Sequence, residues 1–100
     1  MTIMRIGEFE LRNRTYIDDR VPTTHNLEIV KWKERNGHEY YYTIATFNKN
    51  GEIVSCMDRL FKAINDDENI EAAILAISKM ADVASTIINC SNPVPAYSAE

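Results

Sequence analysis

The sequence predicts an α+β fold in which a three-stranded antiparallel sheet, one strand plus a β-hairpin, is covered by two C-terminal helices. The order of elements is β-β-β-α-α. Two observations predict this class. Segments rich in β-branched and aromatic residues flank Asn36-Gly37, and apolar residues recur at helical spacing through most of the chain after residue 52. Sheets and helices of this kind each have one apolar side, so the natural arrangement packs the helices on one face of the sheet.

Length and composition indicate one folded domain. The chain has 100 residues, of which 45% are hydrophobic and 26% charged, as is ordinary for a globular domain. We assign residues 1–90 to this single domain. The last ten residues, "SNPVPAYSAE", contain two prolines among small polar residues and are expected to form a flexible tail.

The first strand is expected within "IGEFELRN", residues 6–13. Phe9 and Leu11 would lie on one side of this strand, and Glu10 and Arg12 on the other. The following residues, 16–26, contain an Asp pair, a Pro and two Thr, which predicts a loop. That loop is long enough for the first strand to pair away from the second.

Asn36-Gly37 predicts the hairpin, because a type I′ turn requires positive φ at both central residues. With a two-residue turn, Trp32 faces Tyr41 on one side of the sheet and Lys31 faces Tyr42 on the other. This register also places two like charges, Glu34 and Glu39, opposite each other. A slip by one position toward an Arg35–Glu39 pair is the alternative, and it would exchange the faces.

Two helices are expected after the hairpin. Apolar spacings of 4, 3, 1 and 3 from Ile53 to Ile64 favour a helix over about residues 52–65, with Asn48 or Asn50 as its cap. Asn50-Gly51 leaves a second hairpin open, so residues 52–57 could instead form a strand. Asn65 and Glu68 have the spacing of a capping box for a second helix that runs to about Asn89.

The apolar arc of this second helix is wide, which is typical of a helix buried on two sides. One side would meet the sheet, and the other either the preceding helix or a partner subunit. We therefore expect a homodimer. Its helix residues would be Ile70, Ile74, Ile77, Met80, Ala81, Ala84, Ile87 and Ile88.

Charge and composition limit the classes of partner. The net charge of −4 argues against a protein that grips a phosphate backbone over its whole surface, although the first half of the chain allows a local basic patch. No apolar run reaches the ~20 residues that cross a bilayer, and the first residues lack the apolar block of a signal peptide. We expect a cytoplasmic protein without a membrane partner.

Catalytic chemistry finds little support in the residue types. The two histidines, His25 and His38, and the two cysteines, Cys56 and Cys90, have no metal-ligand spacing, and the three glycines form no phosphate-binding pattern. Asp18-Asp19 near His25 is expected to be an ordinary acidic loop. The sequence predicts no enzyme, no metal and no cofactor, and free thiols rather than a disulfide.

The hairpin holds the candidate binding residues. Aromatic side chains beside Lys and Arg resemble a platform on which single-stranded bases stack, although Lys-Tyr pairs are also common sheet packing. Both hairpin faces carry large apolar groups, and a bare apolar patch rimmed by charge usually marks a contact site. We predict a protein-binding module, with a sheet-platform binder of single-stranded nucleic acid or nucleotides as the alternative. The candidate residues are Lys31, Trp32, Lys33, Arg35, Tyr40, Tyr41 and Tyr42.

Four segments carry a resemblance to a known class of proteins: "IGEFEL", "EIVKWKERNGHEYYYTIATF", "EIVSCMDRLFKAI" and "ENIEAAILAISKM". In order and apolar pattern, over about residues 5–82, they resemble small bacteriophage accessory proteins. The resemblance implies a phage or prophage protein made inside a bacterium, in a group whose role is mostly unassigned. Small acidic phage proteins often resemble inhibitors of host systems, such as anti-restriction or anti-CRISPR proteins. No functional residue is carried over.

Overall fold

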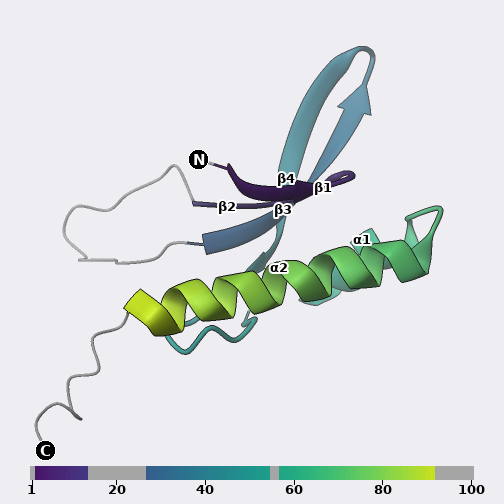
Figure 1. Cartoon of the computed structure of the whole chain (residues 1–100). Helices are drawn as coiled ribbons and strands as arrows, with labels where there is room; N and C mark the ends of the chain where they lie inside the picture. Colours follow the sequence, from purple (N-terminus) through teal and green to yellow (C-terminus); the bar gives the residue numbers. More distant parts are fainter. Residues whose placement is uncertain (1, 14–26, 55–56, 92–100) are drawn as a thin grey trace, which may run out of the picture.

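The computed structural model describes residues 2–13, 27–54 and 57–91 (Figure 1). Four strands precede two helices: β1 (Thr2–Ile6), β2 (Phe9–Asn13), β3 (Leu27–Arg35), β4 (His38–Thr46), α1 (Met57–Asn65) and α2 (Ile70–Ser91). The strands form one antiparallel sheet in the order β1-β2-β3-β4, and both helices lie along one side of it. The α+β class and the two C-terminal helices are confirmed, but the prediction of three strands is wrong.

The additional strand comes from a turn inside the segment expected to be one strand. Gly7, at a φ of 60°, and Glu8 reverse the chain, and Ile6 then faces Phe9 across a tight hairpin. Positive φ is easily reached by glycine, which is why the chain can turn here without a longer loop. Met4 and Ile6 of β1 then lie against the same core as β2.

The predicted register of the main hairpin is confirmed over its outer part. Asn36 and Gly37 have φ values of 53° and 83°, and the pairs from Arg35–His38 to Val30–Thr43 follow the expected order. The slipped register is not adopted, and Glu34 does face Glu39. A bulge between residues 29 and 30 then shifts the pairing by one residue, so that Ile29 faces Ala45 and not Ile44.

The outer half of this hairpin extends beyond the rest of the sheet. β2 pairs with β3 only from Leu27 to Lys31, whereas pairing between β3 and β4 continues to Arg35 and His38. Figure 1 shows this end of the β3–β4 hairpin rising away from β1 and β2. The residues from Glu34 to Tyr41 are all exposed.

The core lies between the sheet and the helices. Apolar side chains from β2, β3 and β4 meet one face of each helix, and small residues on the helices let them approach the sheet closely. The most buried members, with no more than 3% of their surface exposed, are Phe9, Leu11, Leu27, Ile29, Ile44, Ala45, Ala63, Ala73, Ala76, Met80, Ala84 and Ile88.

The segment before α1 corrects the expectation of a helix from residue 52. Ile53 forms a β-bridge with Phe47, and the Val54 amide donates to the Thr46 carbonyl at 3.2 Å. The Asn48 side chain accepts the amides of Asn50 and Glu52 at 2.8 and 3.0 Å, which stabilises a turn rather than a helix start. α1 begins at Met57, and residues 55–56, including Cys56, lie outside the described residues.

The cap of α2 also differs from the expectation. Asn69 caps the helix, since its Oδ1 accepts the Ala72 amide at 3.1 Å, whereas Asn65 is the last residue of α1. Asp67 accepts the Asn69 amide at 2.9 Å and fixes the cap in place. A helix of 22 residues is ~33 Å long at 1.5 Å per residue, so α2 spans the sheet.

The expectation that no segment is long and apolar enough to cross a membrane is wrong. Over Ile70–Cys90, α2 is long and apolar enough to do so, with a mean hydropathy of 1.4. Charged residues interrupt it, and its buried face packs on the sheet. Only 33% of this stretch is buried inside the structure, so the fold covers part of its apolar surface and leaves the rest exposed.

Candidate functional site

The seven candidate binding residues of the hairpin do not form one surface. Lys31, Lys33, Tyr40 and Tyr42 lie on the side of the sheet that faces the helices. Trp32 and Tyr41 lie on the opposite side, and Arg35 is exposed at the hairpin end. Alternation along the strands causes this division, because neighbouring residues point to opposite faces.

The side opposite the helices, called the open face here, has no described element packed on it. There the Trp32 and Tyr41 rings lie with centroids 5.0 Å apart at an interplanar angle of 56°. The Arg5 guanidinium lies 5.1 Å from the Trp32 ring centroid, and that of Arg12 lies 4.5 Å from the Tyr41 ring centroid. We call these four residues the open-face cluster. Both contacts are cation–π pairs.

Glu10 holds the open-face cluster from beneath. Its side chain, only 3% exposed, accepts a 2.8 Å hydrogen bond from the Trp32 indole N–H and another from the Thr2 hydroxyl. Burial acts to raise the pKa of Glu10, but the two hydrogen bonds and the charges of Arg12 and Arg5 outweigh it, so the pKa lies below its ordinary value. The ionised carboxylate therefore fixes the indole.

Glu28 lies beside the second arginine. Its Oε2 lies 3.9 Å from Arg12 Nε, and its Oε1 accepts a 2.7 Å hydrogen bond from the Thr43 hydroxyl. Glu28 itself is buried. The 3.9 Å separation is too long for a hydrogen bond, and within the described residues the buried Arg12 Nε has no hydrogen-bond partner, while the Arg12 guanidinium lies over the ring of Tyr41 on β4. The open-face cluster takes one residue from each of β1, β2, β3 and β4, and the hydrogen bond that the Trp32 indole donates to Glu10 fixes that ring before any partner binds.

A cleft lies on the other side of the hairpin, between the projecting strands and α1. It encloses about 500 Å³ and is lined by Lys33, Tyr40, Tyr42, Arg59, Lys62 and Asp66. We call it the hairpin–α1 cleft. Burial raises the pKa of Tyr42, and the charges of Asp66 and Glu8 add to this, while Arg59 opposes it. Tyr42 therefore remains a protonated hydrogen-bond donor at neutral pH.

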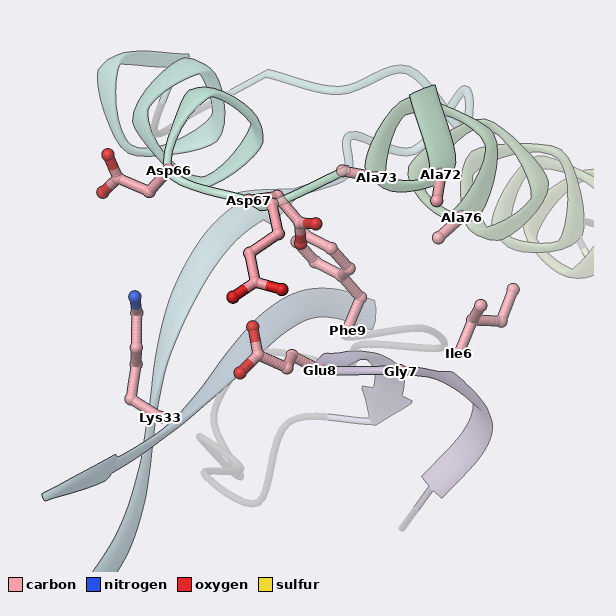
Figure 2. Close-up of a pocket in the computed structure, with 11 residues that line it drawn as sticks. Ile6, Gly7, Glu8, Phe9, Lys33, Asp66, Asp67, Ala72, Ala73 and Ala76 are labelled. Atoms are coloured by element: carbon pink, nitrogen blue, oxygen red, sulfur yellow. The ribbon is translucent and has the colours of Figure 1, made fainter. Parts of the chain in front are cut away.

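An adjoining cleft of about 510 Å³ lies between the Gly7–Glu8 turn and the connection from α1 to α2. Figure 2 shows the Glu8 side chain pointing toward the connection that carries Asp67, with Lys33 rising at the margin beside Asp66. Glu68 adds a further carboxylate to the lining. Within residues 2–13, 27–54 and 57–91, no three His, Cys, Asp or Glu side chains are placed to hold a metal ion.

The residues expected at a dimer interface fall into two groups, one buried in the core and one exposed or half-buried. Ile77, Met80, Ala84 and Ile88 are buried in the core of their own chain, so they cannot serve a partner while this packing persists. Ile70 and Ile74 are 45% and 47% exposed, and Ala81 and Ile87 are half-buried. Leu75, which the sequence did not single out, is 61% exposed.

Sequence reasoning missed the side chains that complete both surfaces. Arg5, Glu10 and Arg12 come from β1 and β2, and the alternation that placed Glu10 and Arg12 on one side of a strand was the signal for the latter two. Arg59 and Lys62 come from α1, and their i, i+3 spacing, which places them on one helical face, could have indicated the second surface. His25, Asp18 and Asp19 lie outside the described residues, and Cys90 is a free, exposed thiol.

Comparisons with known proteins give no further assignment: no protein-family model, no curated protein and no solved structure matches the chain.

Proposed function

We propose that this protein is a non-enzymatic protein-binding module that binds its partner through the open-face cluster and the adjoining part of the hairpin. The observation that carries the proposal is the Trp32–Tyr41 pair held between Arg5 and Arg12 on the face opposite the helices. Trp, Tyr and Arg are the residues that most often dominate binding energy at protein interfaces.

Preorganisation supports the same proposal. Ordering a long side chain on binding costs about 0.5–1.5 kcal/mol, and a side chain that is already fixed avoids much of this cost. Glu10 fixes Trp32 through the 2.8 Å hydrogen bond from the indole N–H. Tyr41 is 40% exposed and so can still lose surface to a partner. The exposed guanidinium of Arg5 favours a partner that presents a carboxylate beside an apolar centre, whereas the Arg12 side chain is only 11% exposed and lies near Glu28.

The proposed setting follows from the resemblance to small phage accessory proteins. In this setting the protein is made from a phage or prophage in the bacterial cytoplasm and modulates a host system by occupying a host protein. An aromatic pair with an exposed arginine suits a protein surface better than it suits mimicry of DNA, which requires exposed acidic side chains.

The chain provides a matched pair of variants for the test. Tyr40 and Tyr41 are neighbours on β4 with similar exposure, 47% and 40%, but they lie on opposite faces. Immobilised wild-type, Tyr40→Ser and Tyr41→Ser proteins are incubated with bacterial lysate, and bound proteins are quantified by mass spectrometry. We expect a partner retained by wild type and Tyr40→Ser but lost with Tyr41→Ser and with Arg12→Gln.

Direct titration then quantifies the loss. Calorimetry with the purified partner should give a Kd at least about tenfold weaker for Tyr41→Ser, as for an interface hot spot. Thermal unfolding of each variant controls for folding. A partner lost equally with Tyr40→Ser and Tyr41→Ser, or the absence of any protein enriched over the Tyr41→Ser sample, contradicts the proposal.

Homodimerisation remains a proposal with a smaller interface than expected. It is supported by the exposure of Ile70, Ile74 and Leu75 on α2. Sedimentation equilibrium at high micromolar concentration should give the mass of two chains, and Ile74→Glu should return the mass of one chain. A mass of one chain for the wild type contradicts the dimer.

A further inference from the structure

We propose that the hairpin–α1 cleft is a nucleotide-binding site, which takes a phosphate-bearing ligand with an aromatic base. The site lies on the face opposite the open-face cluster and goes beyond the protein-binding function. Its volume of about 500 Å³ falls within the range of roughly 300–1,000 Å³ that is typical of small-molecule sites.

Positive charge is concentrated in this cleft, against the balance of the whole chain. Lys33 comes from β3, and Arg59 and Lys62 come from neighbouring turns of α1, so three cations face one carboxylate, that of Asp66. The chain as a whole has a net charge of −4. A local reversal of this kind concentrates anionic ligands in a cleft.

The donors in the cleft are not used up by the fold. Within the described part of the chain, neither Lys33 nor Lys62 forms an ion pair, and Arg59 makes only a long contact, 3.5 Å from Nη1 to the Thr43 carbonyl. Lysine and arginine are the usual side chains for phosphate, lysine as a point charge and arginine as a planar fork. We therefore expect the phosphates to lie near Arg59 and Lys62.

The tyrosines provide the second half of the ligand's chemistry. Tyr40 and Tyr42 are two residues apart on β4 and share a face, Tyr40 half exposed and Tyr42 packed against the core. An exposed aromatic ring can stack on a base, at about 1–3 kcal/mol per base in single-strand binding proteins. A ligand that is only an anion would gain nothing from stacking on these rings.

Asp66 limits the ligand further. It lies at the border with the adjoining cleft, whose lining adds Glu8, Asp67 and Glu68. A long duplex would bring phosphates against these carboxylates and be repelled. A free nucleotide or a short single strand can place its phosphates near Arg59 and Lys62 and its base at Tyr40, with Asp66 as the one carboxylate in the same lining. These two sources share one chemistry and are separated by the experiment.

The experiment uses the full chain with ATP, inorganic tripolyphosphate and a ten-residue oligo(dT) as probes, followed by amide NMR and calorimetry at low salt. We expect saturable binding of ATP with a Kd below about 1 mM. Lys62→Glu should raise the Kd for ATP at least tenfold, and Tyr40→Ala should weaken ATP without affecting tripolyphosphate. Tighter binding of oligo(dT) than of ATP assigns the site to a single strand, and the reverse assigns it to a free nucleotide.

Matched controls keep the outcome interpretable. Lys79→Glu reverses the charge of a lysine on α2 that does not line the cleft, and Tyr41→Ala removes a ring from the other face of β4, so both should leave ATP binding unchanged. All four substituted side chains are exposed, and thermal unfolding checks that the variants fold. Absence of saturable ATP binding, or equal loss with Lys62→Glu and Lys79→Glu, overturns the site. If the wild type binds ATP but retains no partner over the Tyr41→Ser sample, only the open-face proposal is contradicted.

Discussion

The fully buried ammonium group of Lys31 donates a 2.9 Å hydrogen bond to the backbone carbonyl of Ala63. This bond joins the middle of the sheet to the last turn of α1. Carbonyls in a last turn lack partners within the helix, and the negative end of the helix dipole favours a cation there. The Phe9 ring, 5.3 Å from Nζ, completes the surroundings. A lysine that looked like part of a binding surface therefore has a structural role.

Truncation of Lys31 should destabilise the fold. Lys31→Ala removes the hydrogen bond and leaves a cavity in the core, and we expect a loss of ~3 kcal/mol in the free energy of unfolding. Lys31→Met preserves most of the volume and also removes a buried charge, so its cost should be no more than ~1.5 kcal/mol. Urea denaturation measures both. Equal costs for the two variants would contradict the packing argument.

Glu10 should make stability depend on pH. Its pKa in the folded state lies below the ordinary value of 4.5, so its stabilising effect is fully present above pH 4.5 and is lost as the pH falls through the folded-state pKa. Glu10→Gln removes this titration. Between pH 6 and pH 3 the wild type should lose more stability than Glu10→Gln, as followed by thermal unfolding. Parallel pH profiles would show that Glu10 does not titrate in this way.

Gly51 should tolerate no side chain. It has a φ of 85°, and a Cβ atom there would lie 2.9 Å from the Ser85 Cα in α2, which cannot move aside as a flexible side chain could. Gly51→Ala should cost about 2 kcal/mol or more, through backbone strain and displacement of the turn. Gly37→Ala is the control, because its φ is similar but a Cβ there would meet open space. Chemical denaturation should place Gly37→Ala at about half that cost.

Replacement of one carboxylate of the facing pair Glu34 and Glu39 should increase the stability of the fold. The two carboxylates lie opposite each other at the exposed end of the hairpin. Glu34→Lys replaces a repulsive pair with an attractive one, and we expect a gain of about 0.5 kcal/mol at low salt, which shrinks at 1 M salt. Thermal unfolding at the two salt concentrations measures it. Glu34→Gln should give a smaller gain, and a salt-independent change would indicate another cause.

The sequence was most informative where one local signal dominates. Asn36-Gly37 determined the turn, and with it the pairing as far as Val30–Thr43. The bulge, which leaves Ile44 of β4 without a facing residue in β3, has no comparable signal in the sequence, and both Ile44 and Ala45 are buried in the core. Gly7 turns the chain in two residues, whereas the alternation around it reads equally well as one continuous strand.

The sequence did not predict which side chains come together at the candidate sites, because these contacts depend on packing between elements that are distant in sequence. Alternation separates Trp32 from Lys33, but only the docking of α1 decides which face stays open. The charges beside each ring come from elements distant in sequence, with Arg5 and Arg12 from the first hairpin and Arg59 and Lys62 from α1. The apolar arc of α2 indicated that one side of the helix packs on the sheet. It did not separate residues that serve the core from residues left for a partner.

The hairpin that bears Tyr40 and Tyr41 is a single layer of backbone with a different surface on each side. A protein on one side and a small ligand on the other would not compete for space, so one molecule could hold both at once. The same layer would connect them, because Lys33 and Trp32 are neighbours in one strand. If occupancy of one surface changes affinity at the other, linkage requires the effect to be equal in both directions. Binding of a small ligand would then change the affinity of the chain for its protein partner.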